Sequence, residues 1–188
     1  PNLLRGALVG QQLSKTLSYA LRHAPEKFGL QLNDEGFVAI DDIIAVLKKS
    51  SKKWENLDLA TIEALLQSSK KQRFELKNGQ IRALYGHSIA QKIAKKTSAP
   101  PKLLYHGTAR KVVRLIQQHG LHPMGRQYVH LSVDIKTATT VGKRHDTEPV
   151  ILVIDAYTAY QKGIVSFYKE KNGIWLSDPI PPQYIQFG

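Results

Sequence analysis

The sequence predicts an α+β protein with two lobes, an N-terminal winged-helix lobe and a C-terminal lobe built on short β-strands. Three observations predict this class. Helical patterns and then a hairpin pattern fill the first half, β-prone runs dominate the second, and a segment with two prolines lies between them at residues 95–101. Because prolines cannot easily continue a helix or join a central strand, this segment is expected to link a domain of residues 1–96 to one of residues 97–188.

The first helix is expected to end at Arg22 and His23. Apolar residues recur at helical spacing over residues 13–24, and Pro25 disfavours helical geometry in the residue before it. An extended stretch at residues 28–32, a turn and a short apolar run are expected to follow. The end of this helix thus presents a guanidinium and an imidazole side by side.

Two further helices and a hairpin complete the first lobe. Asp41 precedes the first of the two helical patterns and is its expected N-cap, and a third helix is expected to follow Asp58. Asn78 and Gly79 separate two short β-prone runs, which is a strong signal for a two-residue hairpin turn. The inward faces of the two helices are expected to hold Ile43, Ile44, Leu47, Leu59, Ile62, Leu65 and Leu66. Three helices closed by a hairpin is the order of a winged-helix module.

The second half alternates short strands with two helices. One helix is expected to cover about residues 110–119 and to stop at Gly120, and another is expected to follow Asp134 as its N-cap. The strands are expected at residues 103–106, 128–131, 150–154, 164–167 and 174–176. This mixture predicts an α+β lobe.

The composition narrows the classes of function. The formal net charge is +12 and the chain has no cysteine. A basic excess of this size favours a polyanionic partner, usually nucleic acid, although a generally basic surface that aids solubility gives the same number. The absence of cysteine excludes thiol catalysis and disulfides and suits a reducing cytoplasm. No apolar run is long enough for a membrane span and the first residues lack a signal-peptide core, so we expect a cytoplasmic protein with no membrane partner. A monomer is the default expectation for a chain of this kind.

Arginine and histidine dominate the candidate functional residues. Arg22 and His23 form a pair suited to phosphate, because a guanidinium binds phosphate oxygens with two hydrogen bonds and an imidazole contacts the same oxygens. Arg73, Arg82 and Arg126 lie at strand or turn positions from which they could converge on the same group, but on spacing alone each is expected to be a solvated surface arginine. No phosphate-cradling glycine motif and no zinc motif is present, so no metal is expected.

Two predicted strands each carry a histidine and a hydroxyl. His106, Gly107 and Thr108 lie at the end of the first, where the glycine lets a ligand approach the backbone. His130 and Ser132 have the same parity in the second and are expected to face one side of the sheet. The two strands are therefore candidates to line one cleft, with a strand-ending turn and paired core histidines as the alternatives.

Several blocks in one order resemble the RNA 2′-phosphotransferases, also called tRNA 2′-phosphotransferases. The blocks are Leu13-Ser14-Lys15, Leu21-Arg22-His23-Ala24-Pro25, Gly29-Leu30, Gly36-Phe37-Val38, Lys71-Gln72-Arg73-Phe74, Ile81-Arg82-Ala83, Gly86-His87-Ser88, Tyr105-His106-Gly107-Thr108, the run from Met124 to Ser132, the run from Asn172 to Leu176, and Ile180-Pro181-Pro182. The resemblance spans nearly the whole chain. The sequence departs from the family's usual pattern at Tyr128, where histidine is frequent, and at Leu84 and Tyr85, which are more apolar than expected.

The resemblance implies a winged-helix RNA-binding lobe joined to an ADP-ribosyltransferase-like lobe that binds NAD+, which is consumed as a co-substrate. It implies that an internal RNA 2′-phosphate, as left at tRNA splice junctions, attacks the anomeric ribose carbon of NAD+ and expels nicotinamide. The ribose 2″-hydroxyl of the resulting ADP-ribosylated RNA then attacks the phosphate, which releases 2′-OH RNA and ADP-ribose 1″,2″-cyclic phosphate.

Carried over residue by residue, the family's catalytic tetrad would be Arg22, His23, Arg73 and Arg126. The NAD-binding positions would be His106, Gly107, Thr108, His130 and Ser132. Two alternatives remain at this point: an ADP-ribosyltransferase that acts on nucleic-acid phosphate ends or protein, and a non-catalytic winged-helix protein that binds nucleic acid.

Overall fold

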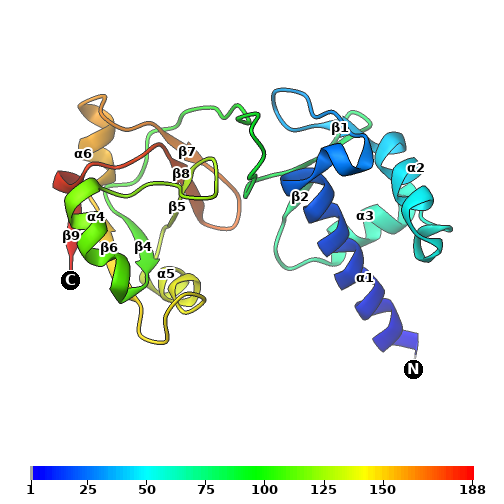
Figure 1. Cartoon of the computed structure of the whole chain (residues 1–188), viewed down its shortest axis with the longest axis horizontal. Helices are drawn as coiled ribbons and strands as arrows, with labels where there is room; N and C mark the ends of the chain where they lie inside the picture. Colours follow the sequence, from blue (N-terminus) through cyan, green and yellow to red (C-terminus); the bar gives the residue numbers. More distant parts are fainter. Residues whose placement is uncertain (1) are drawn as a thin grey trace. The chain divides into compact units, whose positions relative to one another are not determined.

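The protein consists of two compact units, Pro1–Ala94 and Lys95–Gly188, each with its own apolar core. The structure is a computed structural model and describes residues 2–188, with side chains from residue 6 onward (Figure 1). It mixes helices and antiparallel sheets, which confirms the α+β class. The expected linker contains no helix or strand at residues 95–101.

The first unit begins with helix α1 (Asn2–Ser18), which continues without a break as one π-helical turn, η1 (Tyr19–His23). It ends at Arg22 and His23 as expected, and the Ala24 N–H closes the π turn on the Tyr19 carbonyl at 2.9 Å. The expected extended stretch at residues 28–32 is wrong at its start. Pro25 fixes a backbone angle that suits a tight turn, and residues Pro25–Phe28 form the 3₁₀ helix η2 instead.

The second helix begins earlier than expected. Strand β1 (Val38–Ala39) runs directly into α2 (Ile40–Ser50), whose N-cap is Ala39 and not Asp41. The N–H of Ile40 donates to the carbonyl of Gly79 in the hairpin turn, so tertiary structure satisfies a helix N-terminal donor that a side chain would otherwise cap. Asp41 lies in the first turn, where its charge still favours the helix dipole.

Helix α3 (Leu59–Ser68) follows Asp58 as expected, and the structure shows that Asp58 caps it, since its carboxylate accepts from the Thr61 N–H at 2.8 Å. A 3₁₀ turn, η3 (Lys52–Trp54), precedes it. Of the residues expected to face inward, Ile62 is fully buried, whereas Leu59 is exposed because the first residue of the helix lies at the rim of the core.

The predicted hairpin is confirmed. Strands β2 (Phe74–Lys77) and β3 (Gln80–Ala83) pair antiparallel, and β1 joins on the other edge of β3. Asn78 and Gly79 have φ of 51° and 71°, the left-handed pair that a type I′ turn requires.

The second unit is built on a six-stranded sheet in the order β7-β8-β5-β4-β6-β9, with every pair antiparallel. Its strands are β4 (Leu104–Thr108), β5 (Val129–Ser132), β6 (Val150–Ile154), β7 (Phe167–Lys169), β8 (Ile174–Ser177) and β9 (Ile185–Phe187). The expected strand at residues 164–167 starts late, because the Ile164 N–H still bonds the Ala159 carbonyl at the end of the preceding helix.

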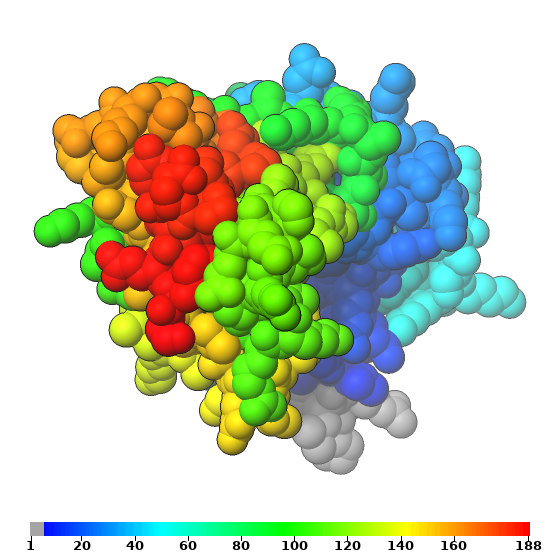
Figure 2. All heavy atoms as spheres, turned by 60° about the vertical axis from the view of Figure 1, so that its left-hand side comes forward, coloured from blue at the N-terminus to red at the C-terminus, as the bar shows by residue number. Residues whose placement is uncertain are grey.

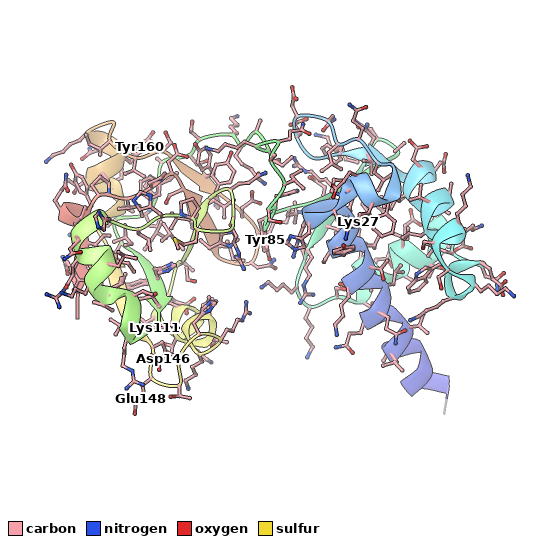
Figure 3. The ribbon with its side chains drawn as sticks, viewed as in Figure 1. Lys27, Tyr85, Lys111, Asp146, Glu148 and Tyr160 are labelled. Atoms are coloured by element: carbon pink, nitrogen blue, oxygen red, sulfur yellow. The ribbon has the colours of Figure 1, made fainter. Side chains whose placement is uncertain are left out.

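The helices of the second unit are η4 (Arg110–Val112), α4 (Val113–His119), α5 (Ile135–Gly142), α6 (Ala156–Gln161) and η5 (Pro182–Tyr184). The expected stop at Gly120 and the Asp134 cap are both confirmed. In Figure 2 the segment after α4 (green) and the C-terminal segment (red) lie side by side, joined where Leu121 pairs with Ile180. Arg110 forms ion pairs with Asp146 and Glu148, which lie on the connection from α5 to β6 (Figure 3).

Helix α5 packs very closely on β4. A methyl group at Gly107 would clash with the carbonyl oxygen of Ala138 and would lie 3.0 Å from the Gly142 Cα atom. The helix backbone therefore occupies the space of a side chain at this position. This close approach alone requires a glycine at position 107. The reason expected from the sequence, that a ligand approaches the backbone there, is not needed to explain the glycine.

Candidate active site

The Arg22 guanidinium lies between aromatic rings in the first unit. Its central carbon is 5.5 Å from the ring centroid of Tyr85 and 5.9 Å from that of Phe74, distances at which a cation is attracted to a ring. Tyr85 is buried, and its ring also has the Lys71 ammonium at 5.8 Å. Figure 3 shows Tyr85 on the segment that follows β3. The rings thus hold the guanidinium in place.

The same segment holds His23. The Nδ1 atom of His23 is 2.7 Å from the Ser88 hydroxyl oxygen, and the Ser88 N–H donates to the Arg22 carbonyl at 3.0 Å. One serine thereby fixes both the backbone and the imidazole ring at the end of the π turn. Sequence reasoning placed Gly86-His87-Ser88 in the resemblance but did not identify this contact. Its only sequence signal is the position of the block directly after the hairpin.

His23 and Arg73 line one cleft of about 580 Å³ in the first unit. Arg73 lies immediately before β2, where its carbonyl accepts from the Leu84 N–H at 2.9 Å and closes the hairpin. Both side chains are exposed. A guanidinium and an imidazole around one opening can bind an anion such as a phosphate group.

Arg126, His130 and His106 form a chain of contacts in the second unit. An Arg126 guanidinium nitrogen is 2.7 Å from His130 Nδ1, and His106 Nδ1 is 2.8 Å from the His130 carbonyl oxygen. A guanidinium only donates and a carbonyl only accepts. His130 Nδ1 therefore accepts and carries no proton, whereas His106 Nδ1 donates. Each hydrogen bond thus selects one tautomer.

Burial lowers the pKa of His106 below its ordinary value, and the hydrogen bond to His130 offsets this only in part. On acidification the unfolded chain therefore takes up a proton at this residue before the folded protein does. We expect the second unit to lose stability as the pH falls below about 6.5. Urea unfolding measured from pH 8 to pH 5 tests this, and the loss should be smaller in the variant His106→Asn. An equal loss in both proteins would contradict it.

The remaining predicted residues of the second unit do not gather on one face. Tyr105 pairs directly with Ser132, so Ser132 shares a face with Tyr105 and Gly107, while His106 and Thr108 alternate to the other face. Thr108 lies opposite Val150 of β6, and the Thr108 and Ser132 side chains are both buried. The structure thus joins His106, His130 and Arg126 and leaves the two hydroxyls separate.

Tyr128 packs inside the second unit. Its ring centroid is 5.0 Å from that of Tyr168 in an edge-to-face arrangement, and the Tyr168 hydroxyl donates to the Asp178 carboxylate. Burial raises the pKa of Tyr128 to about 12. This unusual residue is therefore a neutral core side chain at ordinary pH.

The fold is thus an α+β arrangement in which each unit carries a paired imidazole and guanidinium. The family model for the RNA 2′-phosphotransferase, Tpt1 / KptA family matches residues 10–179. Curated relatives named probable RNA 2′-phosphotransferase include those of Acetivibrio thermocellus, 48% identical over 94% of this chain and 96% of the relative, and Bacillus thuringiensis subsp. konkukian, 45% identical over 92% of each. A relative of the same name in Burkholderia lata is 42% identical over 93% of this chain and 89% of its own length.

The chain belongs to the RNA 2′-phosphotransferase family, and it is a transferase that acts on RNA. In the part of the chain that the structure describes, no group of histidines and carboxylates is arranged to hold a metal ion. Within the same residues, no helix combines the length and apolarity needed to cross a membrane.

Proposed function

We propose that the protein removes an internal 2′-phosphate from RNA in an NAD+-dependent reaction that yields 2′-OH RNA, nicotinamide and ADP-ribose 1″,2″-cyclic phosphate. The observation that carries the proposal is the cleft lined jointly by His23 and Arg73. Arg22, which precedes His23 in the chain, has its guanidinium held by two rings. Membership of the family supports the RNA substrate. The proposal extends to tRNA splice junctions, where such a phosphate is left.

In this proposal the first unit is a winged-helix lobe that binds RNA, and the second is an ADP-ribosyltransferase-like lobe that binds NAD+. Three helices with a three-stranded sheet support the first assignment, and the six-stranded antiparallel sheet with His106 and His130 on adjacent strands supports the second. The domain boundary is proposed after residue 96.

Arg22, His23, Arg73 and Arg126 are proposed to bind the RNA 2′-phosphate. Three guanidiniums hold its oxygens in one orientation and stabilise the additional negative charge that develops when a nucleophile attacks phosphorus. The RNA phosphate is already an anion, so it needs no general base to act as a nucleophile. His23, oriented through Nδ1 by Ser88, is proposed to contact the phosphate or to donate a proton to the departing RNA hydroxyl.

The residues of the second unit fit NAD+ by the chemistry of their donor set. His106 is half-buried and favours the neutral form, with Nδ1 donating to a carbonyl, so the ring presents Nε2 as a fixed acceptor for a ligand hydroxyl. His130, Thr108 and Ser132 are proposed as further NAD+-binding residues, with the two hydroxyls on opposite faces of the sheet, and Gly107 is proposed to position β4 against α5. When bound, NAD+ supplies an electrophilic ribose carbon with nicotinamide as the leaving group.

The direct test combines the protein, NAD+ and a single-stranded RNA with one internal 2′-phosphate. We expect 2′-OH RNA, nicotinamide and the cyclic phosphate in equal amounts. The matched control RNA lacks the 2′-phosphate, and RNAs with a 5′- or 3′-terminal phosphate test transfer to ends. Folded protein that produces neither dephosphorylated RNA nor the cyclic phosphate would rule out the proposal.

Ser88 is predicted to be a positioning residue for His23. Replacing it with alanine removes the hydroxyl at Nδ1, and we expect kcat to fall about tenfold with a small change in KM for RNA. Ser88→Thr keeps a hydroxyl and should recover much of the loss, whereas a structural defect would not respond to the hydroxyl. If Ser88→Thr and Ser88→Ala behave alike, the positioning role is wrong.

A further inference from the structure

The cleft that holds His23 and Arg73 extends along helix α1. Its walls include Gly10, Ser14 and Ser18 on one face of α1, and Ser68 and Ser69 at the end of α3. We call this feature the α1 groove. The lining also reaches Gly6, so the groove follows α1 over residues 6–18, a distance of about 18 Å at the rise of an α-helix. That length exceeds what one phosphate group needs.

The charge of the α1 groove suits a polyanion with many hydrogen-bonding groups. Lys15 and Arg73 supply positive charge, and the lining residues that the structure describes include no acidic side chain. Ser14 and Ser18 bring hydroxyl groups to the groove, whereas the Ser68 and Ser69 hydroxyls donate to the Leu65 carbonyl and present acceptor lone pairs. At Gly10 the backbone of α1 forms part of the surface, with the Leu65 side chain as its neighbour on α3. A ribose-phosphate backbone matches this combination of charge and hydroxyls.

An aromatic ring lies where the α1 groove reaches His23. Tyr19 lines the groove at the first residue of the π turn and is 41% exposed. Phe28 supports its ring edge to face at 6.1 Å, and the Lys27 ammonium lies 5.6 Å from the ring centroid (Figure 3). Exposed aromatic rings beside cations are the usual stacking platforms for unpaired bases.

We infer that the α1 groove binds the single-stranded RNA segment that flanks the 2′-phosphate, with a base stacked on Tyr19 and the backbone along Lys15 and the serines. The inference rests on the proposed function for the position of the 2′-phosphate at His23 and Arg73. It assigns to α1 the recognition of the strand, which is separate from the binding of the phosphate. Longer RNAs should then bind more tightly than the phosphorylated dinucleotide.

Gly10→Glu is the first test variant, because it places a carboxylate in the groove and replaces a helix glycine with a better helix former. The space beside Gly10 permits a side chain, since an added Cβ would be 3.7 Å from Leu65 Cδ1. Binding is measured without NAD+ by fluorescence anisotropy, with a single-stranded 2′-phosphorylated RNA of about 12 nucleotides, a length typical of single-strand sites. The same assay is run on a duplex of that RNA and on the 2′-phosphorylated dinucleotide.

We expect Gly10→Glu to weaken binding of the long single strand about tenfold, the effect of losing one stacked base or close charge contact, and to leave dinucleotide binding within about twofold. Gly10→Gln tests bulk without charge, and Gln161→Glu adds the same charge on α6 as a control. Tyr19→Ala should weaken the long strand about tenfold, while Tyr19→Phe keeps the platform and should have little effect.

Equal effects of Gly10→Glu on the long strand and the dinucleotide, or no effect on either, would overturn the inference. Tighter binding of the duplex than of the single strand would also overturn it. Because these measurements need no turnover, they remain decisive if the protein fails to release nicotinamide. If the protein dephosphorylates both the long RNA and the dinucleotide but binds them equally tightly, the proposed function stands and the α1 groove is not a binding site for the RNA strand.

Discussion

Arg126→Ala is expected to lower turnover of 2′-phosphorylated RNA by about 100- to 1,000-fold, the usual cost of removing one fixed charge donor from a developing oxyanion. Arg126 lies two residues after the positive-φ Met124 and contacts His130 at 2.7 Å. The variant removes both a proposed phosphate ligand and the donor that selects the His130 tautomer. Both losses act in the same direction.

Single-turnover kinetics with saturating NAD+ measure this effect. Arg114→Ala is the matched control, because Arg114 is an exposed arginine on α4 of the same unit and has no place in the proposed site. Arg126→Lys keeps the charge but not the planar fork and should recover only part of the rate. Turnover within twofold of the parent protein in Arg126→Ala would remove Arg126 from the tetrad.

Gly107→Ala is expected to destabilise the second unit by roughly 3 kcal/mol, at the upper end of the cost of overpacking. The added methyl group meets the backbone of α5 at Ala138, and a helix backbone cannot move aside as a flexible side chain does. Gly125→Ala is the control, since a methyl group there has no neighbour within 4 Å.

Tryptophan fluorescence separates the two units in this experiment. Trp54 belongs to the core of the first unit and Trp175 to that of the second, so a Trp54→Phe background reports unfolding of the second unit alone. Equal urea midpoints for Gly107→Ala and Gly125→Ala would show that α5 does not hold β4 as closely as described.

Features with a local chemical signal were predictable from the sequence. The hairpin turn at Asn78 and Gly79, the helix start after Asp58 and the cap at Asp134 each depend on residues close together in the chain, and all are confirmed. The Asp41 cap was wrong because a distant carbonyl, that of Gly79, satisfies the helix end. Helix α6, six residues long, and strand β9, three residues long, were missed because they are too short for a periodic pattern to register.

The candidate site was predictable as residue types but not as geometry. Helical spacing and Pro25 identified the Arg22 and His23 pair at a helix end, yet nothing local indicates that Tyr85 and Phe74 hold the guanidinium or that Ser88 holds the imidazole. These contacts join positions far apart in the chain. The unusual Tyr85 becomes intelligible only when its ring is seen beside Arg22.

The π turn at Tyr19–His23 holds one residue more than a turn of α-helix, and this extra residue sets the direction in which Arg22 and His23 point. An α-helix turns about 100° per residue, so a chain one residue shorter at this turn would continue as an ordinary helix and rotate His23 away from Ser88. Substitutions can exchange side chains along α1 without this consequence, whereas a single deletion would redirect the pair. Length is therefore more tightly constrained than composition in this segment.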